Sequence, residues 1–243
     1  MKILVIGYGQ IAEEFARLNP QFQILGIRRQ NTSKLSNVEI INEDYSSGIS
    51  ITAQKFDPDW IIYFPKIKNS GLSEYENGYL KQLNNLYDLF PSAKKIFISS
   101  TKVFSGYANL EVDESSPAKA ADAQGKVIVK YEQIIQNHED SFLLRLSGLI
   151  TQSSNFVKLV VNKKLFSSNK YINAIHLDDV VSIISGIVNE HISAKLINCV
   201  MPYSKKYSDL FVDFSGEPVN AEIKSIKYNK TSNFKFKSVE KLL

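Results

Sequence analysis

A glycine turn near the N-terminus sets the strictest limit on the fold of this chain. The segment Gly7-Tyr8-Gly9-Gln10-Ile11-Ala12 has the pattern GxGxxA, directly after the apolar run Ile3–Ile6 and at the start of the amphipathic stretch Gln10–Leu18. In a strand–turn–helix unit the first glycine permits the tight turn, and the second lets a pyrophosphate approach the backbone. Amides at the helix start attract phosphates. The pattern predicts a dinucleotide-binding turn, against the alternative of a purely structural one.

The rest of the chain alternates short apolar runs with longer amphipathic stretches. This alternation predicts the α/β class, with a Rossmann doubly wound parallel sheet and helices on both faces. The expected strands are Ile3–Ile6, Phe22–Ile27, Val38–Ile41, Trp60–Phe64, Ile96–Ile98, Phe142–Leu146 and Leu196–Val200. The expected helices are Gln10–Leu18, Leu72–Phe90, Ala123–Asn137, Phe156–Leu165, Val180–Asn189 and Ser204–Phe214, and Tyr107–Lys119 is expected to be a polar loop.

The end of the second expected strand carries arginines where NAD-binding proteins usually carry an acid. NAD sites place Asp or Glu about 20 residues beyond the glycine turn, where it accepts hydrogen bonds from the ribose. Here no acid lies between Glu14 and Glu39, and the strand ends at Arg28 and Arg29. A guanidinium group suits a 2′-phosphate. We therefore expect NADP rather than NAD, the alternative being two solvated arginines.

Composition restricts the class of protein further. The 243 residues are 44% hydrophobic and 22% charged, which is ordinary for a globular protein, and the net charge of +4 is too mild to indicate a nucleic-acid partner. One cysteine excludes an internal disulfide, and three scattered histidines give no metal-ligand spacing. No apolar stretch approaches the roughly 20 residues of a membrane span, and no signal peptide is recognisable. We expect a cytoplasmic protein with no metal and no membrane partner.

Several further segments, taken in order, resemble the extended short-chain dehydrogenase/reductase superfamily, the NAD-dependent epimerase/dehydratase family. Ile96–Gly106 is similar to the fifth-strand motif that usually ends in Val-Tyr-Gly, and Asp113–Pro117 to the acidic loop after it. Leu144–Ile150 resembles the sixth strand, and Tyr171–Val180 the segment that returns over the substrate cleft. The resemblance implies a dinucleotide-binding core at 1–150. It also implies a smaller C-terminal substrate-side lobe at 151–243, interleaved with the core in one structural unit.

The resemblance also implies roles for individual residues. Ser100 corresponds to the family residue that hydrogen-bonds the substrate. Ser99 is expected to line the cofactor site, although a structural role at the strand end is an open alternative. The other expected cofactor-binding residues are Gly7, Tyr8, Gly9, Gln10, Ile11, Arg28, Arg29 and Pro65.

The chain departs from the family at its catalytic pair, Tyr-x-x-x-Lys. Alignment on Glu132 places Gln124 at the tyrosine position and Ile128 at the lysine position, and neither side chain can exchange a proton near neutral pH. Lys126 and Lys130 are expected on the solvent face of the helix, outside its apolar stripe. Other candidates for proton transfer are Tyr107, Lys102, Lys66 and His176, with a structural role as the default for His176. Asp179 is expected to cap the helix that begins at Val180.

Two functions remain open. The first is an NADP(H)-dependent reductase or epimerase/dehydratase-like enzyme acting on a small polar or nucleotide-sugar substrate. The second is a non-catalytic NADP(H)-binding redox sensor or regulatory protein, which loss of the catalytic pair favours. A homodimer through Leu72–Phe90 and Ala123–Asn137 is compatible with their apolar stripes, but so is simple packing on the sheet.

Overall fold

A computed structural model describes residues 1–30, 32–67, 69, 71–228 and 234–243. Its central sheet has seven strands in the order β10-β7-β5-β4-β1-β2-β3. The strands are β1 (Lys2–Ile6), β2 (Gln23–Arg28), β3 (Val38–Asn42), β4 (Trp60–Tyr63), β5 (Lys94–Ser100), β7 (Ser141–Leu146) and β10 (Leu196–Cys199). The pairs β1–β2, β1–β4, β2–β3 and β4–β5 are parallel. The predicted α/β class and doubly wound sheet are confirmed, and the strand order reverses between β1 and β4, where such folds bind ligands.

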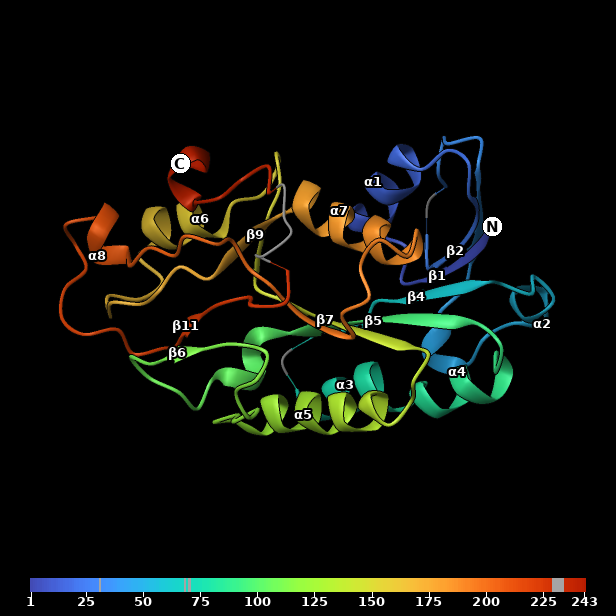
Figure 1. Ribbon diagram of the computed structural model, residues 1–243, viewed down its shortest axis with the longest axis horizontal. Helices are drawn as coiled ribbons and strands as arrows, with labels where there is room; N and C mark the ends of the chain where they lie inside the picture. Colours follow the sequence, from blue (N-terminus) through green and yellow to red (C-terminus); the bar gives the residue numbers. More distant parts are fainter. Residues whose placement is uncertain (31, 68, 70, 229–233) are drawn as a thin grey trace. The chain divides into compact units, whose positions relative to one another are not determined.

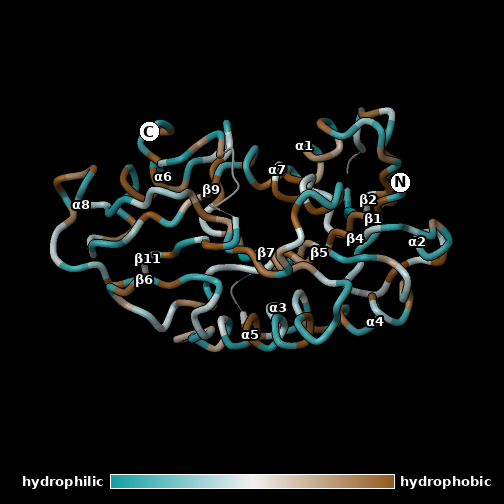
Figure 2. The backbone as a smooth tube through the Cα atoms, in the orientation of Figure 1, coloured by the Kyte–Doolittle hydropathy of each residue, from teal (hydrophilic) through white to brown (hydrophobic). Residues whose placement is uncertain are grey.

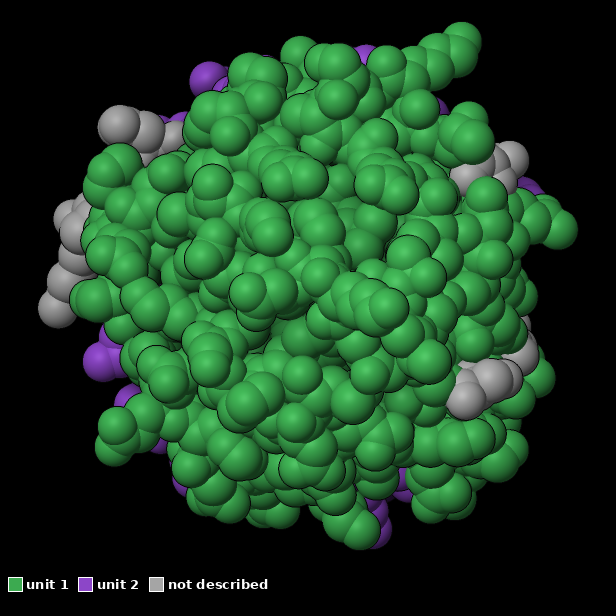
Figure 3. All heavy atoms as spheres, turned by 90° about the vertical axis from the view of Figure 1, so that its right-hand side faces the viewer, with its two compact units in different colours: residues 1–99, 130–143, 181–195 green, residues 100–129, 144–180, 196–243 purple. Residues whose placement is uncertain are grey.

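The chain divides into two compact units, each made of three segments. Unit 1 comprises Met1–Ser99, Lys130–Leu143 and Val181–Lys195, and unit 2 comprises Ser100–Val129, Leu144–Val180 and Leu196–Leu243. Figure 3 shows the face that unit 1 forms. The boundary near Gly148 expected from the sequence remains a prediction.

In unit 1, helices cover both faces of the sheet. Figure 1 shows α1 (Gln10–Leu18) and the unit 1 part of α7 (Leu177–Val188) on one face. It shows α3 (Leu72–Tyr75), α4 (Leu83–Leu89) and the unit 1 part of α5 (Ala123–Gln136) on the other. A strand covered on both faces is apolar throughout, and Ile3, Leu4, Val5 and Ile6 are indeed fully buried. Apolar residues run along the strands and polar residues along the outer loops (Figure 2). A short helix, α2 (Ile51–Gln54), joins β3 to β4.

Unit 2 has small sheets and a core of its own. The strands β6 (Glu111–Val112) and β11 (Glu222–Ile223) pair with each other, as do β8 (Gly148–Ile150) and β9 (Ala174–His176). The helices α6 (Phe156–Lys163) and α8 (Tyr207–Leu210) pack on a core of apolar side chains: Ile150, Val157, Val160, Ile172, Ala174, Met201, Tyr207, Phe214 and Val239.

The predicted continuous helix Leu72–Phe90 is wrong, because it is interrupted by a π-helical segment, Glu76–Leu80, between α3 and α4. The cause lies at Gly78. Its carbonyl accepts a hydrogen bond from the Tyr63 hydroxyl at 2.7 Å, and a Cβ there would lie 2.4 Å from the Lys66 carbonyl oxygen. The close approach to β4 and its following loop reshapes the helix at this turn.

Three smaller differences concern unit 2. The helix expected over Ser204–Phe214 is reduced to the single turn α8, and the loop Tyr107–Lys119 contains the short strand β6. Helix α7 begins at Leu177, so the prediction that Asp179 caps it is wrong. The Asp179 carboxylate instead accepts hydrogen bonds from the amides of Lys235 and Phe236, at 2.7 and 3.2 Å.

Candidate functional site

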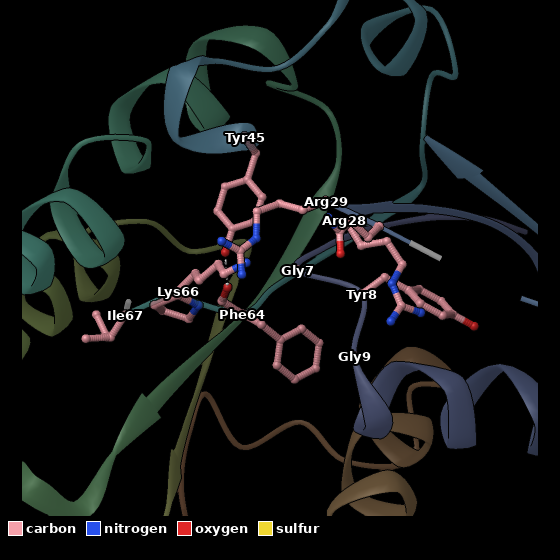
Figure 4. A pocket seen from close by; sticks show the side chains of 11 residues that line it. Gly7, Tyr8, Gly9, Arg28, Arg29, Tyr45, Phe64, Lys66 and Ile67 are labelled. Carbon is pink, nitrogen blue, oxygen red and sulfur yellow. Dashed lines mark hydrogen bonds between the residues drawn. The ribbon is translucent and has the colours of Figure 1, made fainter. Parts of the chain in front are cut away.

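A cavity of about 660 Å³ lies in unit 1 at the carboxyl ends of β1, β2 and β4 (Figure 4). Its walls come from the glycine turn, from the end of β2, and from the segments that follow β3 and β4. The lining residues are Gly7, Tyr8, Gly9, Arg28, Arg29, Gln30, Tyr45, Phe64, Pro65, Lys66 and Ile67. Six of the predicted cofactor-binding residues thus share one cavity: Gly7, Tyr8, Gly9, Arg28, Arg29 and Pro65.

The two glycine positions of the turn differ in backbone conformation and in the space left for a side chain. Gly7 has φ of +85°, and a Cβ there would lie 2.7 Å from the Phe64 carbonyl oxygen, so only glycine fits without strain. Gly9 has an ordinary extended backbone, and a Cβ there would meet only the Gly7 carbonyl oxygen, at 3.7 Å. The protein therefore needs Gly7 to make the turn, whereas the space in front of Gly9 is left open.

That open space lies at the N-terminus of α1. Gly9 is the N-terminal cap of this nine-residue helix, and no side chain among the described residues caps it. Helix N-termini carry amides without intrahelical partners and a partial positive charge. An anion placed against Gly9 would therefore be bound by the start of the helix.

The charges around the cavity also favour an anion. Arg28, Arg29 and Lys66 contribute three cations, and none of the residues that line the cavity in the described part of the chain is acidic. The glycine turn is held against the end of β2, because the amides of Gly7 and Tyr8 both donate to the Ile27 carbonyl, at 3.0 and 2.9 Å. The cations and the helix start therefore belong to one anchored surface.

Tyr45 lines the cavity beside the segment that follows β4, and its place in the site was not predicted from the sequence. Its hydroxyl donates to the Phe64 carbonyl at 2.8 Å, and burial raises its pKa well above the usual range of tyrosine. The phenol is thus a neutral donor at physiological pH. Tyr45 follows β3 in a segment without periodicity, and only its place after a parallel strand could have indicated that it would reach the site.

Gln10, Ile11 and Ser99 do not line the cavity. Gln10 is exposed and the Ile11 side chain is buried, so any contact through their backbone amides remains a prediction. Ser99 is buried, and its hydroxyl donates to the buried Glu132 carboxylate at 2.6 Å. Ser99 therefore has a structural hydrogen bond, and its expected place beside the cofactor remains a prediction.

In unit 2, Ser100 caps the 3₁₀ turn Thr101–Phe104. Its hydroxyl oxygen accepts a hydrogen bond from the amide of Lys102 at 3.2 Å, and its side chain is partly exposed. Lys102 forms an ion pair with Asp122 at 2.8 Å. Ser100 is therefore a fixed hydroxyl that retains access to solvent, and its role toward substrate remains a prediction.

Gln124 and Ile128, which the alignment on Glu132 places at the catalytic positions, cannot transfer a proton near neutral pH. Gln124 is partly exposed in the first turn of α5, and Ile128 is buried in the next turn. The expectation for their neighbours is confirmed, since Lys126 and Lys130 are exposed. Tyr131 offers no substitute, because it is fully buried, and burial raises its pKa far above the range of a catalytic base.

His176 and Tyr107 are also engaged within unit 2. The Nδ1 of His176 accepts a hydrogen bond from the Asp178 amide at 3.2 Å. The centroid of its ring lies 4.0 Å from that of the Phe236 ring, and burial lowers the pKa of the imidazole. The Tyr107 hydroxyl donates to the Pro117 carbonyl at 3.0 Å. Within the described residues, no three His, Cys, Asp or Glu side chains gather as metal ligands.

The strand order, the glycine turn at its switch point and the helices on both faces define the class: a Rossmann-type α/β protein. No family model and no curated protein matches the chain. Solved structures do match. A protein from Methylobacillus flagellatus, provisionally assigned as an NAD-dependent epimerase/dehydratase, is 22% identical with a TM-score of 0.72, covering 92% of this chain and 88% of that one.

Two further structures carry NAD. A short-chain dehydrogenase/reductase superfamily protein from Agrobacterium tumefaciens with bound NAD is 14% identical, with a TM-score of 0.72 and coverage of 96% of this chain and 92% of that one. UDP-glucuronic acid 4-epimerase from Bacillus cereus in complex with NAD is 15% identical, with a TM-score of 0.68 and coverage of 92% and 88%. This chain therefore shares the fold of these three solved structures. Over the described residues, every helix is too short or too polar to cross a bilayer.

Proposed function

We propose that this protein binds a nicotinamide dinucleotide in the cavity beside the glycine turn. The observation that carries the proposal is the open space in front of Gly9 at the start of α1, in a cavity with three cations. The pyrophosphate would lie against the amides at this helix start, where backbone donors and the helix dipole favour negative charge. Similar structures with bound NAD support this choice of ligand.

We further propose a preference for NADP(H) over NAD(H). The two cofactors differ by the 2′-phosphate on the adenosine ribose, which carries about −1.5 to −2 charge at pH 7. Arg28 and Arg29 line the cavity, and the acid that usually binds the ribose hydroxyls is missing between Glu14 and Glu39. The NAD seen in the similar structures argues for the dinucleotide class, whereas these local charges argue for the phosphorylated form.

Calorimetric titration with NADPH and NADH tests both proposals. The wild type should bind NADPH more tightly than NADH. Gly9→Val fills the open space and should weaken both ligands by at least about 10-fold, or 1.4 kcal/mol. Arg17→Ala, at the far end of α1, removes a charge without touching the cavity and should bind as the wild type does. Tighter binding of NADH would overturn the preference, and unchanged affinity in Gly9→Val would overturn the site.

For the chemistry, we propose a reductase or epimerase-like reaction on a small polar or nucleotide-linked sugar. Bound nicotinamide would supply or accept hydride. Ser100 would orient the substrate through its partly exposed hydroxyl, which the Lys102 amide holds in place. Proton transfer would fall to a group other than Gln124 or Ile128. Similarity to an epimerase that acts on a UDP-sugar supports the substrate class.

Turnover of NADPH with a panel of sugar nucleotides and carbonyl compounds tests this chemistry. Activity should be abolished in Ser100→Ala and partly retained in Ser100→Thr, which keeps a hydroxyl. Tight NADPH binding with no turnover across the panel would instead identify a non-catalytic sensor or regulatory protein.

A further inference from the structure

The two arginines at the end of β2 lie on different sides of the cavity. Arg28 is the last residue of β2 and Arg29 follows it, and successive residues of an extended chain point in opposite directions. Figure 4 shows Arg28 beside Tyr8 and Arg29 beside Tyr45. The two guanidinium groups are therefore not equivalent, and a 2′-phosphate would meet one of them first.

Arg28 rests on an aromatic ring. The central carbon of its guanidinium lies 5.9 Å from the centroid of the Tyr8 ring, within the range of a cation–π contact. A guanidinium held over a ring can still donate N–H hydrogen bonds to an anion in its own plane. The contact therefore restricts the rotamers of Arg28 while its hydrogen-bond donors stay available.

The Tyr8 ring is itself immobilised. Tyr8 is only 2% exposed, and its amide donates to the Ile27 carbonyl at 2.9 Å. The ring packs on β2 over Gly26, where a Cβ would lie 2.6 Å from the Tyr8 ring and 2.7 Å from Ile40. Gly26 thus leaves the space that the ring occupies, and the glycine turn, the ring and Arg28 form one packed layer.

Burial keeps the Tyr8 phenol neutral, although Ser33 and Arg28 act in the opposite direction on its pKa. Burial is the main cause that raises the pKa of its hydroxyl, and the carboxylate of Glu13 adds to the rise. That carboxylate accepts a hydrogen bond from Ser33 at 3.0 Å. A neutral phenol ring keeps the electron-rich face that attracts a guanidinium.

We propose that Arg28 is the residue that recognises the 2′-phosphate and that Tyr8 is its positioning residue. The proposal rests on the dinucleotide site proposed above. Arg29, which is exposed and lies beside Tyr45 across the cavity, contributes less than Arg28 to the distinction between the two cofactors.

The test measures the ratio of the NADH and NADPH dissociation constants by calorimetry. Arg28→Leu should lower this ratio by at least about 10-fold, the size of a lost charge-assisted hydrogen-bond pair. Tyr8→Leu should lower it roughly three- to tenfold, whereas Tyr8→Phe keeps the ring and should change it less than about twofold. Arg29→Leu should lower the ratio less than Arg28→Leu does, and Arg17→Ala, at the far end of α1 and outside the cavity, is the matched control that should leave the ratio unchanged.

A double-mutant cycle separates positioning from general damage. In the Arg28→Leu background, Tyr8→Leu should change the ratio no further, because the residue it positions is gone. Equal weakening of both cofactors by Tyr8→Leu, or a larger effect of Arg29→Leu than of Arg28→Leu, would overturn this inference and leave the dinucleotide site intact. A wild type that binds neither cofactor would overturn the site, and this inference with it.

Discussion

Gly7 and Gly9 differ by two positions in the chain and should respond in opposite ways to the same added methyl group. At Gly7 alanine must adopt φ of +85°, which costs an L-residue about 1–2 kcal/mol. Its Cβ would also lie 2.7 Å from the carbonyl oxygen and 3.0 Å from the Cβ of Phe64. Moving this backbone adds about 1–3 kcal/mol of overpacking. Gly7→Ala should therefore lower the free energy of unfolding by about 2–5 kcal/mol.

Gly9→Ala should leave stability unchanged or raise it. Gly9 has φ of −128°, which alanine tolerates, and the nearest atom to the added Cβ is 3.7 Å away. Replacing glycine in a compatible conformation removes freedom from the unfolded chain and stabilises proteins by about 0.4–1 kcal/mol.

Urea unfolding monitored by tryptophan fluorescence compares the two variants directly. Trp60 is the single tryptophan, and it is buried in β4, next to β1 in the sheet. With a slope of about 3 kcal/mol per molar urea, a loss of 3 kcal/mol moves the midpoint down by about 1 M. Equal midpoints for Gly7→Ala and Gly9→Ala would refute the reasoning, as would a lower midpoint for Gly9→Ala.

Three further predictions concern buried polar groups. Ser99→Ala removes the hydroxyl that donates to the buried Glu132 and should cost about 1–3 kcal/mol in urea unfolding, whereas a cost below 0.5 kcal/mol would contradict that bond. Burial lowers the pKa of His176 below 6.5, so the unfolded chain takes up a proton more readily than the native state, and stability should fall as the pH decreases through 6.5. His176→Gln should show a shallower fall in thermal melts between pH 5 and about 6.5, and an identical fall would exclude His176 as the cause. Burial raises the pKa of the Cys199 thiol, so a thiol reagent at about pH 8 should modify it only after denaturant is added.

Local patterns explain why the sheet and the glycine turn could be predicted. The bounds of α1, Gln10–Leu18, follow from one apolar face, and the buried strand β1 follows from a continuous apolar run before a glycine. The interruption of the helix at Gly78 could not be predicted, because it depends on a hydroxyl from Tyr63, 15 residues away.

The candidate site divides in the same way. One strand–turn–helix–strand pattern contains Gly7, Gly9 and Arg28. Their presence in the same cavity could therefore be predicted from the local sequence. Tyr45 and Ile67 reach the cavity from segments without periodicity, after β3 and β4. Ser99 and Ser100 are adjacent hydroxyls at one strand end, and the buried hydrogen bond from Ser99 to Glu132 could not be predicted because its partner lies 33 residues away.

The division into two units has a consequence for biosynthesis. The last segment of unit 1, Val181–Lys195, follows two segments of unit 2, Ser100–Val129 and Leu144–Val180, in the sequence. A nascent polypeptide cannot complete this unit until Lys195 has left the ribosome. A fragment ending at residue 150 would lack that segment and, with it, the part of α7 that covers the sheet beside α1. Such a fragment would expose apolar surface, so heterologous expression should favour the undivided chain.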